Sequence, residues 1–153
     1  MLRCRILAIG RLRPGPFAAL AALYAGRLAP PAVIVELEVR QRLPAAALKA
    51  REAELILTAL PGQSRLVALD RRGGMWSSRG FADRLAAWRD AGVPELAFAI
   101  GGAEGLDAAI LDRAATRMSL GPMTWPHLLV RGMLLEQLYR AQQILAGHPY
   151  HRE

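Results

Sequence analysis

Two charged side chains, Glu136 and Arg140, stand four residues apart in a long apolar stretch near the carboxyl end of the chain. On a helix this spacing places them on one face, in a narrow polar stripe that also includes Gln143. The rest of the circumference is apolar, and a helix of this kind has to be buried on more than one side. Glu136 and Arg140 are therefore candidates for a buried or cleft-facing pair, and the alternative is an ordinary ion pair on the surface.

The last residues of the chain combine an aromatic ring, an imidazole and a guanidinium. Tyr150 could stack on a base and Arg152 could pair with a phosphate, with His151 between them. Chain ends are usually slack, so a disordered terminus is the alternative.

Three loops are expected to follow strands, and in parallel sheets ligands bind at the carboxyl ends of strands. The first follows Leu69, and the second begins with Gly101 and Gly102, where missing side chains would let a ligand approach the backbone. The alternative is that these glycines only form a turn. The third loop is stiffened by two prolines and consists of Leu120, Gly121, Pro122, Met123, Thr124, Trp125 and Pro126.

Several other kinds of site are not indicated. The chain has neither the glycine spacing of a dinucleotide fingerprint nor the Gly-Lys-Ser/Thr of a phosphate-binding loop. Its three histidines lack the paired spacing of metal ligands, so no metal site is expected. Cys4, the single cysteine, lies in a strand-like run where a small buried hydrophobe is expected rather than a nucleophile.

Strands and helices are predicted to alternate along the chain, which indicates an α/β fold with a mostly parallel sheet and helices on both faces. The continuously apolar strand 96–100 is expected at the centre of the sheet, and strand 33–39 near an edge. The basic stretch 71–74 is expected to be a flexible loop. The predicted strands are 2–9, 33–39, 65–69, 96–100 and 118–120, and the predicted helices are 17–28, 45–60, 77–90, 106–116 and a last one that starts at Pro126.

Composition limits the function further. A length of 153 residues predicts a single domain, 1–153. The net charge of +7 favours an anionic partner, with nucleic acid ahead of membrane, although the nearly exclusive use of arginine could instead reflect a GC-rich genome. Neither a membrane-spanning run nor a signal-peptide pattern is visible, so a cytoplasmic protein is expected. The apolar last helix suggests that a second copy of the chain covers it.

Five segments together resemble the RlmH (YbeA-like) methyltransferases of the SPOUT superfamily, and the match extends over the whole chain. The terminal hexapeptide His-Pro-Tyr-His-Arg-Glu is the most specific part. The matching segments are 69–70, 100–105, 124–131, 136–141 and 148–153. The resemblance implies S-adenosylmethionine-dependent methylation of N3 of a pseudouridine in large-subunit ribosomal RNA, within the ribosome or the large subunit. It also implies a homodimer and a deep trefoil knot in the carboxyl-terminal half.

Mapped onto this sequence, the resemblance puts S-adenosylmethionine against Leu69, Gly101, Gly102 and the loop 120–126. We expect the base to be held by Glu136, Arg140, Tyr150, His151 and Arg152, without a metal. Which group takes the N3 proton is left open, and Glu136 could serve only to orient Arg140. We also expect a composite site, in which one protomer holds the cofactor and the other supplies the tail.

One departure from the family pattern is the short loop Arg40-Gln41-Arg42, which is often lysine-rich in these proteins and puts RNA contacts there in doubt. The sequence leaves two other functions open. A non-enzymatic ribosome-binding or assembly factor would need no small-molecule pocket, which the glycine and proline loops suggest. A different RNA methyltransferase of the superfamily is less favoured because the chain has no additional RNA-binding domain.

Overall fold

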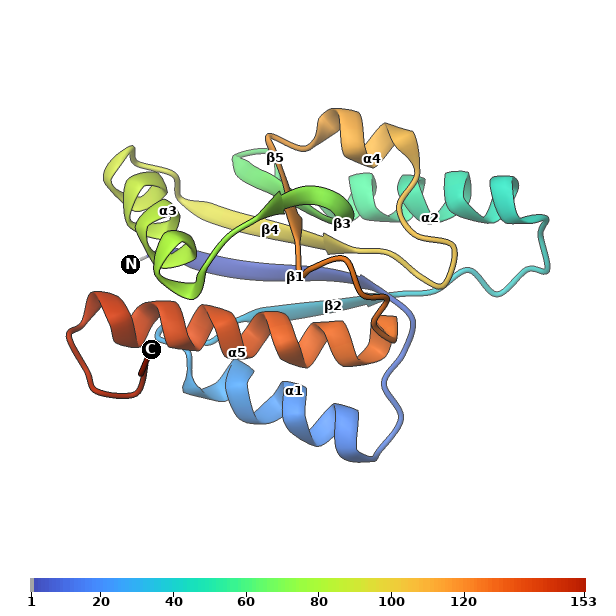
Figure 1. Cartoon of the computed structure of the whole chain (residues 1–153). Coiled ribbons are helices and arrows are strands. Elements are labelled where there is room, and N and C mark those ends of the chain that lie inside the picture. Colours follow the sequence, from blue (N-terminus) through green and yellow to red (C-terminus); the bar gives the residue numbers. More distant parts are fainter. Residues whose placement is uncertain (1) are drawn as a thin grey trace.

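The computed structural model describes residues 2–153, in which strands and helices alternate (Figure 1). This alternation confirms the α/β prediction. The elements in chain order are β1 (Arg3–Ile9), α1 (Pro16–Arg27), β2 (Val33–Leu37), α2 (Ala45–Ala59), β3 (Ser64–Met75), α3 (Ser78–Asp90), β4 (Glu95–Ile100), α4 (Ala108–Arg113), β5 (Thr116–Ser119) and α5 (His127–Leu145).

The five strands form one sheet in the order β2-β1-β4-β3-β5, and every neighbouring pair is parallel. The strand β4 lies at the centre and is buried along its whole length, whereas β2 lies at an edge, and both positions confirm the sequence prediction. A strand that is covered on both faces has to be apolar on both, and for this reason β4 shows no alternation of polar residues.

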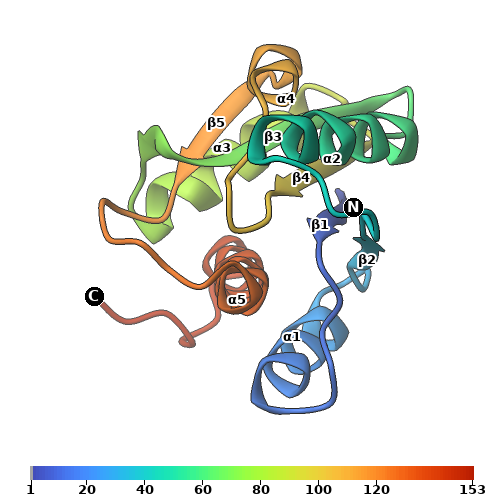
Figure 2. The ribbon, with the colours of Figure 1, turned by 90° about the vertical axis from the view of Figure 1, so that its right-hand side faces the viewer.

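Helices cover both faces of the sheet, as Figure 2 shows. The helices α1, α3 and α5 share one hydrophobic core with one face, and α2 and α4 share another core with the opposite face. Within its layer α5 packs against both α1 and α3. Its apolar circumference, which the sequence suggested would need a second copy, is thus largely covered by its own chain, with Leu134, Leu135 and Leu138 almost completely buried.

The prediction of a flexible loop at 71–74 is wrong, because β3 continues through this stretch to Met75 and pairs with β5. The pairing is irregular between Leu69 and Gly74. A Cβ on Gly73 would lie 2.7 Å from backbone atoms of Arg117 and Met118. Glycine at this position therefore allows β3 and β5 to approach each other closely; it does not make the segment flexible.

The helices α4 and α5 begin later than predicted. The helix α4 is shorter than 106–116, because the Asp107 side chain caps it by accepting from the Ala109 amide at 3.0 Å, and β5 begins already at Thr116. The helix α5 begins at His127, with Pro126 as the capping residue before it. Within residues 2–153, none of the helices combines the length and apolar character that a membrane crossing requires. The knotted threading of the chain stays a prediction.

Candidate functional site

A cavity of about 530 Å³ opens between the helices α1 and α5 and the carboxyl ends of β3 and β5. Its volume lies within the range of roughly 300–1,000 Å³ that is usual for small-molecule sites. Glu136 is the one acidic residue among those that line it. The lining comes from Leu20 and Tyr24 of α1, from Met75, Trp76, Ser77, Ser78 and Phe81, from Met118, Ser119, Leu120 and Gly121, and from Gly132, Met133, Glu136 and Gln137 of α5.

The Glu136 carboxylate is held by four hydrogen bonds. Its Oε1 accepts from Arg140 Nε at 3.0 Å and Nη2 at 2.6 Å, and from the Tyr150 hydroxyl at 3.0 Å, while Oε2 accepts from Gln137 Nε2 at 2.9 Å. The side chains of Glu136 and Arg140 are only 19% and 24% exposed. Of the two sequence interpretations, the structure therefore favours a cleft-facing pair over an ordinary surface ion pair.

The tail folds back onto α5, and two of its three predicted site residues join this network. Arg140 Nη1 lies 3.2 Å from His151 Nδ1, and the guanidinium of Arg140 lies 4.8 Å from the centre of the Tyr150 ring. Arginine can only donate, so His151 Nδ1 accepts and the proton of the neutral ring belongs on Nε2. Arg152 is exposed and lies outside the network.

Two groups in the network have shifted pKa values. The hydrogen bond to Glu136 raises the pKa of Arg140 above its ordinary value, so Arg140 is a permanent cation. The pKa of Tyr150 is also raised, because of its hydrogen bond with Tyr24, its partial burial and the nearby Glu136 carboxylate. Tyr150 therefore keeps its proton at neutral pH and can act as a donor but not as a base.

The residues expected to hold a cofactor lie on, or directly after, three neighbouring strands of the sheet. Leu69 of β3 stands opposite Met118 of β5, and the preceding Ala68 stands opposite Ala99 of β4. This register puts Leu69 beside the carboxyl-terminal parts of β4 and β5, but Leu69 is not itself at a strand end as the sequence predicted, because β3 continues to Met75. Of the third loop, Leu120 and Gly121 line the cavity and the residues 122–126 are exposed.

Gly101 and Gly102 have a packing role. The Gly105 amide donates to the Gly102 carbonyl at 3.0 Å, which closes a tight turn. A Cβ on Gly101 would lie 2.7 Å from the carbonyl carbon of Gly105, and a Cβ on Gly102 would lie 3.2 Å from Ile9 Cγ2 and 3.3 Å from Glu52 Oε1. The turn-forming interpretation of these glycines is thus supported, and their contact with a ligand stays a prediction.

Sequence reasoning missed two residues, one beside the site and one in the interior. Tyr24 of α1 stands among apolar residues at helical spacing, a pattern that indicates only a core position, yet its hydroxyl lies 3.5 Å from that of Tyr150. Arg131 of α5 is only 1% exposed, and it binds Glu36 at 2.5 Å and the Gly10 carbonyl at 3.1 Å. A single arginine inside an apolar run was the available signal, because a buried cation requires a partner.

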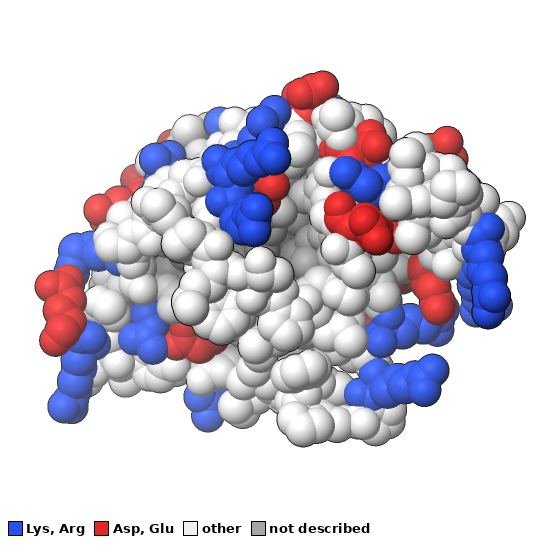
Figure 3. Space-filling model, turned by 45° about the vertical axis from the view of Figure 1, so that its right-hand side comes forward, with Lys and Arg blue, Asp and Glu red and all other residues white. Residues whose placement is uncertain are grey.

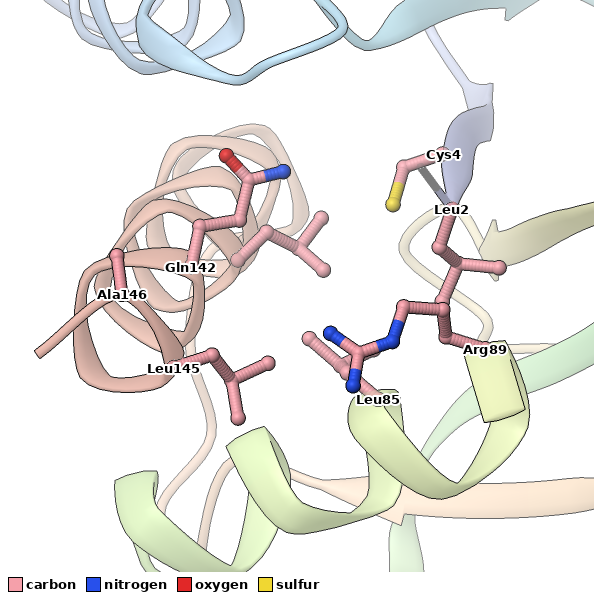
Figure 4. Close-up of a pocket in the computed structure, with 8 residues that line it drawn as sticks. Leu2, Cys4, Leu85, Arg89, Gln142, Leu145 and Ala146 are labelled. Carbon is pink, nitrogen blue, oxygen red and sulfur yellow. The ribbon is translucent and has the colours of Figure 1, made fainter.

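A second cavity, of about 220 Å³, lies near the amino end of β1, away from the strand ends described above (Figure 4). Cys4 opens into it, and burial, together with the charge of Glu95, raises the pKa of the Cys4 thiol to about 12. The thiol is therefore protonated, as expected for a buried hydrophobe. Most of the lining is apolar: Leu2, Cys4, Leu85, Leu138, Leu145 and Ala146, with Arg89 and Gln142 as the polar members. Residues 2–153 contain no cluster of three potential metal-ligating side chains.

Comparison with known proteins agrees with this arrangement. A family model described as "Predicted SPOUT methyltransferase" matches residues 2–151. The chain is 54% identical over 151 residues to the "Ribosomal RNA large subunit methyltransferase H" of Rhodospirillum centenum, which covers 99% of both chains. It is 53% identical over 150 residues to the protein of the same name from Acidiphilium cryptum, which covers 98% of this chain and 94% of that one.

Two solved structures share the fold at low identity. A probable methylase family protein from Haemophilus influenzae matches with a TM-score of 0.58 at 15% identity, over 100% of this chain and 72% of that chain. The putative methyltransferase Lpg2936 from Legionella pneumophila, solved with bound cofactor SAM, matches with a TM-score of 0.50 at 12% identity, over 92% of this chain and 66% of that chain. The full-length family match and the close relatives establish that this chain belongs to the SPOUT methyltransferase family.

Proposed function

We propose that this protein transfers a methyl group from S-adenosylmethionine to N3 of a pseudouridine in large-subunit ribosomal RNA, in the cytoplasm. The observation that carries the proposal is the cavity that Leu120, Gly121 and Glu136 line together. Arg140 and Tyr150 lie next to it, because both donate to the Glu136 carboxylate. The names of the close relatives support the choice of ribosomal RNA as substrate.

The residues around the cavity suit the proposed cofactor. Met118, Leu120 and Met133 provide apolar surface for a nucleoside, and Glu136 provides a negative charge that complements a sulfonium. Gly121 has φ +109, and a Cβ there would meet no other atom within 4 Å, so the backbone is accessible at this point. When bound, S-adenosylmethionine would supply the electrophilic methyl group. The further contacts predicted at Leu69, Gly101 and Gly102 belong to the same proposal.

The network suggests how the chain prepares the base. N3 of an imide reacts well once its proton has left, and the negative charge then spreads over the two neighbouring carbonyl oxygens. Arg140 is a permanent cation and is suited to stabilise that charge. Glu136 orients Arg140 rather than taking the proton, because both its oxygens already accept hydrogen bonds. His151 Nδ1 is likewise engaged, so the N3 proton goes to water in this scheme.

The test is transfer of labelled methyl groups to ribosomes that lack the modification, with the modified position mapped on the RNA. We expect Arg140→Gln to lower kcat by about a hundredfold or more, as for other lost electrostatic contacts, with unchanged affinity for S-adenosylmethionine by calorimetry. Arg51→Gln is the matched control, because Arg51 forms an exposed ion pair with Glu54 on α2, on the opposite face of the sheet.

The outcomes separate the candidate functions. Wild-type protein that binds ribosomes but neither binds S-adenosylmethionine nor transfers a methyl group would be a binding factor. If a nucleotide other than a pseudouridine were methylated, the protein would still be an RNA methyltransferase, but the proposed substrate would be wrong.

A further inference from the structure

Tyr24 stands where α1, α5 and the tail meet. It lines the larger cavity, its ring lies 6.0 Å from that of Tyr139, and its hydroxyl is 3.5 Å from that of Tyr150. The guanidinium of Arg27, one turn further along α1, lies 5.6 Å from the Tyr24 ring and 5.8 Å from the Tyr139 ring. The Tyr24 side chain is therefore held on both sides, and its hydroxyl points to the tail.

The position of α1 relative to α5 is set by one close contact. Gly132 of α5 packs against Leu20 of α1 so closely that a Cβ on Gly132 would lie 2.7 Å from Leu20 Cδ2. One helical turn beyond this contact, Leu20 is followed by Tyr24 and Gly132 by Glu136. The small residue at the crossing thus brings Tyr24 and Glu136 close enough to reach the same tail residue.

Tyr150 is the residue that both helices reach. Glu136 of α5 accepts from its hydroxyl at 3.0 Å, and Tyr24 of α1 lies within hydrogen-bonding distance of the same oxygen. The Tyr150 ring packs edge-on against Tyr139 at 4.8 Å. Fixing both the ring and the hydroxyl of Tyr150 also fixes the adjacent His151, which reaches Arg140.

We propose that Tyr24 is a positioning residue of the methyl-transfer site, which acts by holding Tyr150 through its hydroxyl and thereby makes α1 part of that site. The inference rests on the proposed function for its kinetic consequence. The structural part of the proposal, that Tyr24 of α1 fixes the position of the tail, does not depend on the reaction.

The test compares Tyr24→Phe with Tyr139→Phe, each of which removes one hydroxyl and keeps the ring. For Tyr24→Phe we expect kcat to fall about tenfold, as for one lost hydrogen bond, and KM for S-adenosylmethionine to stay within about twofold. Exchange of the Tyr150 amide hydrogen, which is donated to His148 Nδ1 at 3.2 Å, should become severalfold faster. Tyr139→Phe should change neither kcat nor exchange, because its contribution is the packing of its ring.

A double-mutant cycle adds a second criterion. If Tyr24 acts through Tyr150, the double variant Tyr24→Phe/Tyr150→Phe should be no slower than Tyr150→Phe alone. Additive losses, an unchanged kcat in Tyr24→Phe, or equal losses in Tyr24→Phe and Tyr139→Phe would each overturn the proposal. Should the wild type transfer no methyl group at all, the proposed function fails, and the exchange measurement still decides whether Tyr24 holds the tail.

Discussion

Arg131 is a charged residue in the hydrophobic layer between α5 and the sheet, 1% exposed, and Glu36 at the edge of the sheet is its counter-ion. We expect Glu36→Gln to lower the free energy of unfolding by about 3 kcal/mol, because it leaves a buried guanidinium without a compensating charge. Glu38→Gln is the control, since Glu38 forms an exposed ion pair with Arg11 and should matter by less than about 1 kcal/mol. Denaturant unfolding at pH 7 measures both, and equal effects would contradict the assignment.

The same pair predicts a pH dependence. Burial, the largest single influence, raises the pKa of Glu36, but the Leu12 amide and the charges of Arg131 and Arg11 together outweigh it and lower the pKa. A carboxyl whose pKa is lowered on folding contributes stability above its ordinary pKa and loses it as the pH falls through the folded value. The difference in stability between wild type and Glu36→Gln should therefore narrow below about pH 4. A difference that stays constant from pH 7 to 3 would mean that no ionised pair is involved.

For single residues, the sequence predicted contacts between residues that are close in the chain and missed contacts between residues that are far apart in it. Glu136 and Arg140 could be recognised because four residues separate them on a helix. Tyr24 and Tyr150 are separated by 126 positions, and Arg131 and Glu36 by 95, so no spacing could connect them. Their contacts depend on how α1, β2 and α5 are arranged, which no local pattern contains.

The path of β3 beside β5 depends on Gly73, and this gives a prediction about elements. We expect Gly73→Ala to destabilise the protein by about 2 kcal/mol or more, because its Cβ would collide with backbone atoms of Arg117 and Met118, which cannot rotate away. Gly26→Ala in α1 is the control, since nothing lies within 4 Å of a Cβ there and alanine is the better helix former. Thermal unfolding of both variants is the measurement. A stable Gly73→Ala protein would show that the segment 71–74 is a loop after all.

The elements themselves were largely predictable, and the errors have physical causes. A short uninterrupted apolar run identified β4, and a long apolar run after Pro126 identified α5. The two arginines and two glycines at 71–74 resembled a flexible loop. A sequence does not show whether a glycine makes the backbone flexible or lets two strands pack closely. The apolar circumference of α5 was real, but α1 and α3 cover much of what the sequence assigned to a partner.

At the scale of the molecule, several large apolar side chains near the proposed site remain exposed, among them Met75 at 68%, Met123 at 69% and Trp125 at 39%. Apolar groups that gather at a surface favour a partner. Figure 3 shows basic side chains in separate groups around a broad uncharged area. We expect a homodimer. The composite site, in which the tail of one protomer lies beside the cofactor loop of the other, stays a prediction, and its alternative is a site within one chain, where the tail already reaches Glu136.

Subunit exchange tests this arrangement. One variant lacks residues 147–153, and the other, Leu120→Trp, fills the cavity where the cofactor loop lines it. Each should be inactive alone. If the site is composite, a mixture that contains mixed dimers should recover methyl transfer, because one protomer keeps an intact pocket and the other an intact tail. Absence of recovery in proven mixed dimers would mean that the tail serves its own chain, through the contacts with Glu136 described above.

The order of the strands has a consequence for how the protein is made. The strand β1 lies between β2 and β4, and its pairing with β4 runs from Arg3 opposite Glu95 to Ala8 opposite Ile100. While the chain is being synthesised, the edge of β1 that pairs with β4 therefore stays unpaired until some ninety more residues have emerged from the ribosome. Ile6, Leu7 and Ala8 of this strand are fully buried in the folded protein. Such distant pairing is slow, and the helix that carries Glu136 and Arg140 is completed later still. Nascent chains that stop before β4 should consequently be bound by chaperones and should carry no methyl-transfer site.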